Sequence, residues 1–167
     1  MVVVVVSMRV LELNSYETDV VAWAKEQAEL IRAGRFDLLD IDHIAEEIED
    51  VGKSEQRELA SRMALLLAHL LKWAYQPDRQ TASWQRTIRE QRKGIKKRLA
   101  RSPGLQPVLI DADWQAEIWA DAVALAANET GLADFPDSCE WSMFDEVLQE
   151  DWFPANQHGG DRKAFTP

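Results

Sequence analysis

The sequence predicts an all-α protein: a single-domain bundle of about five main helices around a central apolar helix at about 55–76, plus a short C-terminal helix. Residues 59–75 (LASRMALLLAHLLKWAY) are apolar on nearly every side, and a helix that is hydrophobic all round belongs in the interior of a structure. Strand patterns are nearly absent, and apolar residues elsewhere recur at helical spacing. A length of 167 residues fits one domain with a sizeable core.

The first helix is expected to begin at Asn14 or Ser15, either of which can cap it, and to run to about Ala33. Gly34 follows, where a left-handed residue commonly ends a helix. Before the helix lies a valine-rich segment, residues 1–13, which we expect to be extended or disordered.

Asp40 is the expected cap of a second helix, Ile41–Val51, which Gly52 would end. Ser54 would then cap the central helix, and Pro77 would end it, because proline disfavours helical geometry in the residue before it. The buried stripe of the second helix would consist of Ile41, Ile44, Ala45, Ile48 and Val51.

Three further helices are expected after Pro77. A basic helix would run from a cap at Ser83 to Arg101, and a fifth from Pro103 to about Thr130, with Gly131 as its stop. Ser142 with Asp145 resembles a capping box and would open the short last helix, which ends near Glu150. We therefore assign residues 14–154 to the helical domain and 155–167 to a C-terminal tail.

Charge is unevenly distributed along a chain whose net charge is −10. Residues 79–101 hold nine Lys or Arg against one acid, whereas 102–160 hold twelve Asp or Glu and no Lys or Arg. The overall charge argues against uniform nucleic-acid binding. The apolar run is too short and interrupted to span a bilayer, so no membrane association is expected. With one cysteine, Cys139, no internal disulfide can form, which fits the cytoplasm.

The basic helix, about 84–101, allows three interpretations. Its cations could pair internally with the acidic fifth helix that follows it, contact a protein partner, or bind nucleic acid. Nucleic-acid binding is disfavoured because no known reading motif is present and Trp84 is the only interleaved aromatic residue.

Polar residues inside the apolar run give a second candidate. Arg62 and His69 are seven residues apart and share a helix face, and a charge in such a run must be paired. They form either a structural ion-pair network or, with Lys72 and Arg89, a small cleft that recognises an anion. The candidates for binding a partner or an anion are Arg62, His69, Lys72, Trp84, Arg89, Arg92, Lys96 and Lys97.

A third candidate is a metal site on the second helix. Its members, at positions i, i+3, i+4 and i+7 of one face, are His43, Glu46, Glu47 and Asp50. Helical bundles build metal sites from such residues, with His69 as a further imidazole. The alternative is an acidic face exposed to solvent. A divalent metal is the one cofactor considered, and no complete catalytic set is visible.

Several motifs, in order, resemble the DUF29 family. They are Tyr16-Glu17-Thr18-Asp19 with Trp23 and Gln27; Glu46-Glu47-Ile48-Glu49 with Gly52 and Ser54; His69-Leu70-Leu71-Lys72-Trp73 with Tyr75-Gln76-Pro77; Ser83-Trp84; Thr87-Ile88-Arg89-Glu90-Gln91-Arg92; Phe135-Pro136; Cys139; and Trp152-Phe153-Pro154. The resemblance covers about Tyr16 to Pro154 and implies an all-helical bacterial protein. It brings no catalytic residues, but its motifs include His69, Lys72, Trp84 and Arg89.

The function that the sequence favours is non-enzymatic binding of a protein partner by charged helix faces. The alternative is a metal-dependent, hydrolase-like enzyme using His43, Glu46 and Glu47. Nucleic-acid binding by the basic helix is a weaker alternative, and a homo-oligomer stays open.

Overall fold

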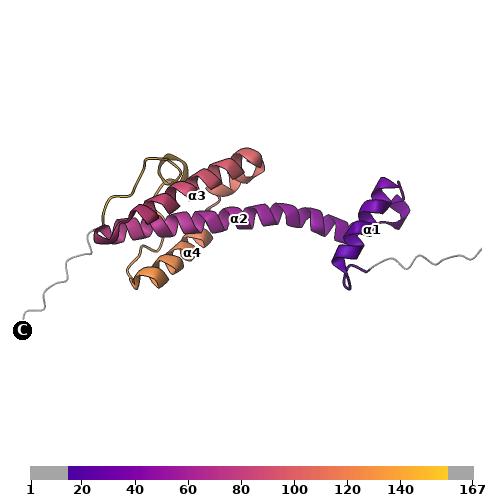
Figure 1. Cartoon of the computed structure of the whole chain (residues 1–167), viewed down its shortest axis with the longest axis horizontal. Coiled ribbons are helices and arrows are strands. Elements are labelled where there is room, and N and C mark those ends of the chain that lie inside the picture. The colour runs from indigo at the N-terminus through magenta and orange to yellow at the C-terminus, as the bar shows by residue number, and fades with distance from the viewer. Residues whose placement is uncertain (1–14, 158–167) are drawn as a thin grey trace, which may run out of the picture. The chain divides into compact units, whose positions relative to one another are not determined.

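The computed structural model describes residues 15–157, and all regular structure in that part is helical, as the sequence predicts (Figure 1). The valine-rich N-terminal segment and the last ten residues of the tail lie outside the described residues. Contacts divide the chain into two compact units, Met1–Gly52 and Lys53–Pro167. The elements in order are α1 (Val20–Arg32), η1 (Phe36–Leu38), α2 (Ile41–Tyr75), η2 (Pro77–Arg79), α3 (Ala82–Arg101), η3 (Pro103–Ile110), α4 (Ala112–Thr130) and η4 (Met143–Val147).

Helix α2 is one continuous helix of 35 residues, so the expected break at Gly52 is wrong. Gly52 does not adopt the positive φ of a helix-ending glycine, and Ser54 lies inside the helix rather than at its start. A helical glycine costs only about 1 kcal/mol relative to alanine, which the hydrogen bonds and packing of a long helix outweigh.

In the first unit, Asp19 rather than Ser15 caps α1, and Asn14, the other expected cap, lies outside the described residues. The carboxylate of Asp19 accepts hydrogen bonds from the backbone N–H groups of Val21 and Ala22, and aspartate is among the preferred N-cap residues. At the other end Gly34 has φ +70°, the left-handed geometry that the sequence predicts.

The stripe expected to be buried in the first unit is largely exposed. Ile41 is 59 % exposed, and Ile48 and Val51 are each 68 % exposed. In this unit α1 packs on a neighbouring side of α2, where the side chains of Trp23 and His43 meet. The apolar spacing therefore identified the helix correctly but not the face that α1 covers.

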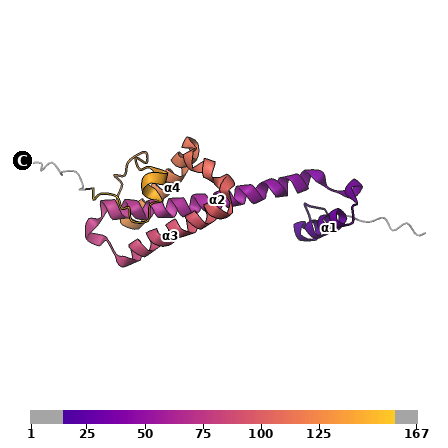
Figure 2. The same cartoon turned by 90° about the horizontal axis from the view of Figure 1, so that it is seen from above.

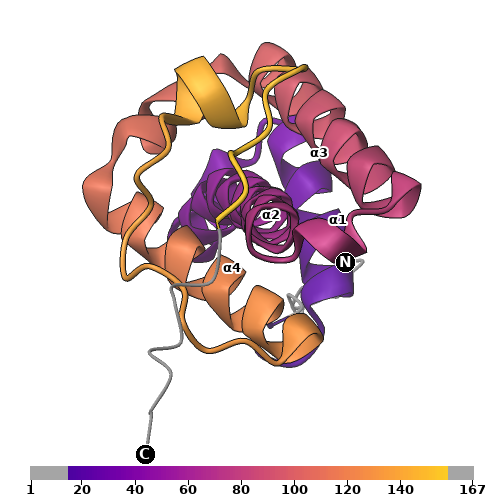
Figure 3. The ribbon, with the colours of Figure 1, turned by 90° about the vertical axis from the view of Figure 1, so that its left-hand side faces the viewer.

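In the second unit, the apolar part of α2 lies between α3 and α4 (Figures 2 and 3). Helix α3 returns antiparallel to α2, because Lys72 of α2 meets Trp84 near the start of α3, and Glu55 meets Arg98 near its end. Leu59, Leu66 and Leu70 of α2 are fully buried in the core that these helices share. Seen nearly end-on in Figure 3, the apolar part of α2 is flanked by α3, α4 and the segment after α4.

The expected fifth helix is broken into two parts, η3 and α4. Pro107 lies inside η3 and cannot donate a backbone hydrogen bond. Asp111 then begins α4 anew, because its carboxylate accepts from the backbone N–H of Trp114 at 2.8 Å. Gly131, with φ +74°, ends α4 as expected.

Two other helix starts were predicted from serines. Helix α3 is capped by Thr81, not Ser83, through a hydrogen bond from the backbone N–H of Trp84. Ser142 does cap the last helix, but that helix is the single π-type turn η4 and ends at Val147 rather than near Glu150. No helix in residues 15–157 is long and apolar enough to cross a membrane.

Candidate functional site

His43, in the predicted metal cluster, is held by Asp40. Their Nδ1 and Oδ2 atoms are 2.7 Å apart, and the indole of Trp23 donates to the same carboxylate oxygen at 3.0 Å. The hydrogen bond with Asp40 raises the pKa of His43 against the lowering effect of burial, and the same bond lowers the pKa of Asp40. The histidine ring stacks on Tyr16, with the ring centroids 4.2 Å apart.

Glu47, a second member of that cluster, accepts a hydrogen bond of 2.7 Å from the hydroxyl of Tyr16. This bond, with burial and the negative charges of Glu47, Glu46 and Asp50, raises the pKa of Tyr16 to about 12. Within residues 15–157, no group of three or more His, Cys, Asp or Glu side chains is arranged to hold a metal ion. The described contacts of His43 and Glu47 are with α1 and the preceding turn, so they join α1 to α2.

Lys72 lies in the second unit, where it joins three helices. The residue is 4 % exposed, and its ammonium group donates to the carboxylate of Glu129 on α4. The same Nζ lies over the ring of Trp84 on α3, 4.7 Å from its centroid, a favourable cation–π geometry. Its hydrogen bond lowers the pKa of Glu129. A lysine this deeply buried needs such a partner.

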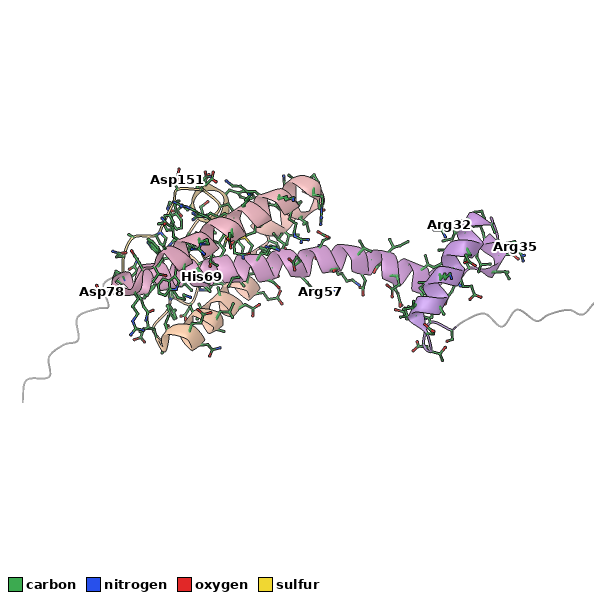
Figure 4. All side chains as sticks on the ribbon, viewed as in Figure 1. Arg32, Arg35, Arg57, His69, Asp78 and Asp151 are labelled. Carbon is green, nitrogen blue, oxygen red and sulfur yellow. The ribbon has the colours of Figure 1, made fainter. Side chains whose placement is uncertain are left out.

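His69 is buried one turn before Lys72, on the part of α2 that α3 and α4 flank (Figure 4). Its Nδ1 lies 3.0 Å from the carbonyl oxygen of Leu65, and burial lowers its pKa although this hydrogen bond opposes the change. A neutral ring that donates Nδ1–H to that carbonyl satisfies both observations.

Arg62 points toward α3 rather than toward His69. Its Nε donates to Glu58 at 2.9 Å, and its Nη1 donates to Gln91 of α3 at 3.3 Å. Gly94 makes this crossing feasible, since a Cβ there would lie 2.9 Å from Nη1 of Arg62. No hydrogen bond or ion pair in the described part of the chain joins Arg62 to His69 or Lys72, so these residues do not form the single anion cleft that the sequence suggested.

Arg92, a predicted partner-contact residue, is instead in the interior. It is 1 % exposed and donates three hydrogen bonds to backbone carbonyl groups, those of Val147 at 2.8 Å, Glu150 at 3.0 Å and Trp152 at 2.7 Å. Burial lowers its pKa to about 10, against the opposing charges of nearby acids, so the guanidinium stays protonated at neutral pH. Arg92 therefore fastens the C-terminal segment to α3.

The cations near the end of α3 pair with α2, not with the acidic α4. Arg98 forms ion pairs with Glu55 and Glu58, and Arg101 pairs with Glu55. Within residues 15–157, no ion pair joins α3 to α4. Because α3 runs antiparallel to α2, its last turns lie beside Glu55 and Glu58 of α2. The prediction that the cations pair inside the protein therefore named the wrong helix, α4 instead of α2.

Five cations of α3 remain, and all are exposed; four of them lie together away from α2. We define this exposed basic face as Arg86, Arg89, Lys93 and Lys96. None of the four forms an ion pair or hydrogen bond through its side chain within the described residues. Lys97 is also exposed and lies at the edge of this face, toward Arg62 and α2.

A family model described as "Domain of unknown function DUF29" matches residues 15–153. The chain belongs to the DUF29 family. No curated protein and no solved structure matches it. The match confirms the resemblance that the motifs carry, and it covers both units of the described chain.

The family motif residues of this DUF29 chain have separate roles in the structure. Lys72 and Trp84 join helices of the second unit, His69 is buried and hydrogen-bonded within α2, and Arg89 is exposed. The predicted list missed Glu129 and Glu55, the acids that pair with Lys72 and Arg98. A signal was present for Glu55, because a tight turn at Pro77 brings residues at equal distances on either side of it together.

Proposed function

We propose that this DUF29 chain is a non-enzymatic cytoplasmic protein that binds an acidic protein partner through the exposed basic face of α3. One observation carries the proposal: α3 separates its cations by role. Arg92 and Arg98 are bound by groups of the chain itself, while Arg86, Arg89, Lys93 and Lys96 stand exposed without an ion pair in the described residues. Four adjacent unpaired cations form a complementary surface for acidic side chains, which speeds association and fixes orientation.

A protein partner is favoured over nucleic acid for two reasons. The net charge of −10 repels a long polyanion outside the basic face itself. Trp84, the aromatic residue of α3, has the ammonium group of Lys72 over one face of its ring, where a base would stack. Binding of a compact acidic surface needs neither a stacking residue nor a long positive groove.

The metal-dependent alternative has no comparable observation to support it. Its proposed ligands His43 and Glu47 are hydrogen-bonded to Asp40 and Tyr16. These contacts give both side chains a structural role in holding the start of α2 against α1 and the turn before it, so partner binding is the function that the structure supports better.

The test is a nuclease-treated pull-down of the whole protein from its native lysate, with quantitative mass spectrometry. The face variant is Arg89→Glu with Lys93→Glu, and the matched control is Lys25→Glu with Arg57→Glu, two exposed cations elsewhere. Each pair changes the net charge from −10 to −14, because each of two substitutions adds −2. We expect one near-stoichiometric protein that the control retains and the face variant loses.

Three outcomes would overturn the proposal. The first is a partner that the face variant still binds, and the second is loss of the partner from both variants, which would indicate a general charge effect. The third is capture only of material that nuclease removes, which would identify nucleic acid as the target.

A further inference from the structure

A small pocket lies between α2 and α3 in the second unit, and basic side chains dominate its lining. Its volume is about 210 Å³. The residues that line it are Arg62, Gly94, Lys97, Arg98 and Arg101. Four of the five residues are cations, whereas the exposed basic face points to solvent and has no such enclosure.

The carboxylates beside the pocket do not balance its cations. Glu55 pairs with Arg98 and Arg101, and Glu58 pairs with Arg62 and Arg98. Burial alone would raise the pKa of Glu55, but the hydrogen bonds and charges of the two arginines lower it, so it is ionised at neutral pH. Four cations and two carboxylates leave two positive charges in excess at neutral pH.

The carboxylates do not use every donor of the two basic residues Arg98 and Lys97. The Nε of Arg98 is buried and has no hydrogen-bond partner in the described residues. A buried donor without an acceptor is unfavourable, so the glutamates do not use the full hydrogen-bonding capacity of this guanidinium. Lys97 lines the pocket and forms no ion pair within residues 15–157.

Gly94 allows Arg62 to approach α3 closely. It is the lining residue over which Arg62 crosses from α2 toward α3, and a Cβ at this position would lie 2.9 Å from Nη1 of Arg62. Alanine is otherwise the better residue in a helix interior. Glycine at this position leaves room for the guanidinium group of Arg62, although alanine would stabilise the helix more.

We propose that this pocket binds the phosphate group of a small phosphorylated molecule. A phosphate dianion matches the excess of two positive charges, and its oxygens can accept hydrogen bonds from Lys97, which has no ion pair within the described residues, and from the guanidinium groups that line the pocket. Guanidinium groups suit this role because their N–H donors match phosphate oxygens in pairs. The site goes beyond partner binding by the exposed basic face, because it uses a different side of α3 and a residue of α2.

The test is a titration of the whole protein with inorganic phosphate, at constant ionic strength maintained with chloride, followed by amide chemical shifts. The pocket variant is Lys97→Gln, and the matched control is Lys93→Gln, one turn earlier on the same helix and outside the pocket. We expect saturable shifts that include the Gly94 amide. Loss of a charged hydrogen bond should weaken binding roughly tenfold in Lys97→Gln, with no change in Lys93→Gln.

A second variant tests the geometry without changing charge. Gly94→Ala should displace the Arg62 guanidinium and weaken phosphate binding several-fold, while Gly52→Ala, with open space around it, should leave binding unchanged. Absence of saturable shifts in the native protein would overturn the proposal. So would equal weakening by Lys97→Gln and Lys93→Gln, or an unchanged affinity in Gly94→Ala. None of these results depends on whether a protein partner is found.

Discussion

Arg92 shows how one residue can hold a segment that has little regular structure. Its guanidinium donates to three backbone carbonyl groups between Val147 and Trp152, and its centre lies 5.4 Å from the ring centroid of Phe153. Carbonyl groups at the end of a helix have no partners within the helix. Arg92 supplies these partners from α3, so it stabilises the C-terminal segment against the rest of the second unit.

Replacing Arg92 by lysine should therefore destabilise the protein. Lysine cannot reach three carbonyl groups with a planar set of donors, and the buried carbonyls left unpaired should cost about 3 kcal/mol in the free energy of unfolding. Urea unfolding measures the change. The control is Arg89→Lys on the exposed basic face, which should stay within about 0.5 kcal/mol of the native protein. Equal effects of the two substitutions would contradict the role of Arg92.

His43 and His69 should titrate on opposite sides of the ordinary histidine pKa of 6.5. The hydrogen bond with Asp40 raises the pKa of His43, and burial lowers that of His69. Ring proton shifts recorded against pH should place His43 above and His69 below that value. The reverse order, or two equal values, would contradict the contacts described for both rings.

These two shifts make opposite contributions to stability. The contribution of His43 is fully present below pH 6.5 and is lost as pH rises through its raised pKa. The contribution of His69 is present above pH 6.5 and is lost as pH falls through its lowered pKa. His43→Ala should therefore weaken the first unit most at acid pH, which helicity measurements during urea unfolding can follow. A larger effect at alkaline pH would contradict this sign.

At the scale of elements, the molecule depends on α2, which contributes residues to both compact units. Its apolar part, after about Leu59, is the core helix of the second unit, while His43 and Glu47 in its first turns contact Trp23 of α1 and Tyr16 in the turn before α1. Gly52 lies inside the continuous helix and does not have a positive φ. One element thus supplies both a core and an exposed apolar stripe.

Two glycine substitutions test whether α2 is continuous at Gly52, because they should change the free energy of unfolding in opposite directions. Gly52→Ala should stabilise the protein by about 0.5–1 kcal/mol, because alanine favours a helix interior and nothing lies within 4 Å of its Cβ. Gly34→Ala should destabilise it by about 1 kcal/mol, because the φ of +70° there is unfavourable for alanine. Urea unfolding of both variants checks the pair. Destabilisation by Gly52→Ala would indicate that the helix ends at this position.

The sequence predicts helices better than it predicts their ends and faces. The run at 59–75 identified the core helix, since continuous apolar character has one outcome in a helical protein. Gly52 was misjudged as a helix end because the preference of one glycine competes with the hydrogen bonding and packing of the whole helix. Pairs between helices that are far apart in the sequence, such as Lys72 with Glu129, depend on the relative register of the two helices, which periodicity does not specify.

The candidate site was also only partly predictable from the sequence. The accumulation of cations in α3 was evident in the sequence, but the distinction between Arg92, which is buried, and Arg89, which is exposed, was not. Both belong to a run in which most residues are polar, and their different roles follow only from which side of α3 faces the C-terminal segment. Gly94 likewise has a role only because Arg62 crosses it.

Over the whole molecule, charge is sorted by role. One group of cations is bound by carboxylates or carbonyl groups of the chain itself. This group consists of Arg62, Lys72, Arg92, Arg98 and Arg101. The cations of the exposed basic face have no such partner in the described residues. In a chain with a net charge of −10, this face is a local exception on an acidic molecule. We expect that the protein folds without these four cations, because they are available to bind a partner only if the fold does not use them.

The most direct test is urea unfolding of a variant in which Arg86, Arg89, Lys93 and Lys96 are all replaced by glutamine. The substitutions remove four positive charges and change the net charge from −10 to −14. Since exposed charges contribute little to stability, we expect a free energy of unfolding within about 1 kcal/mol of the native protein. A loss of several kcal/mol, comparable to that of Arg92→Lys, would contradict the account and show that these cations serve the fold.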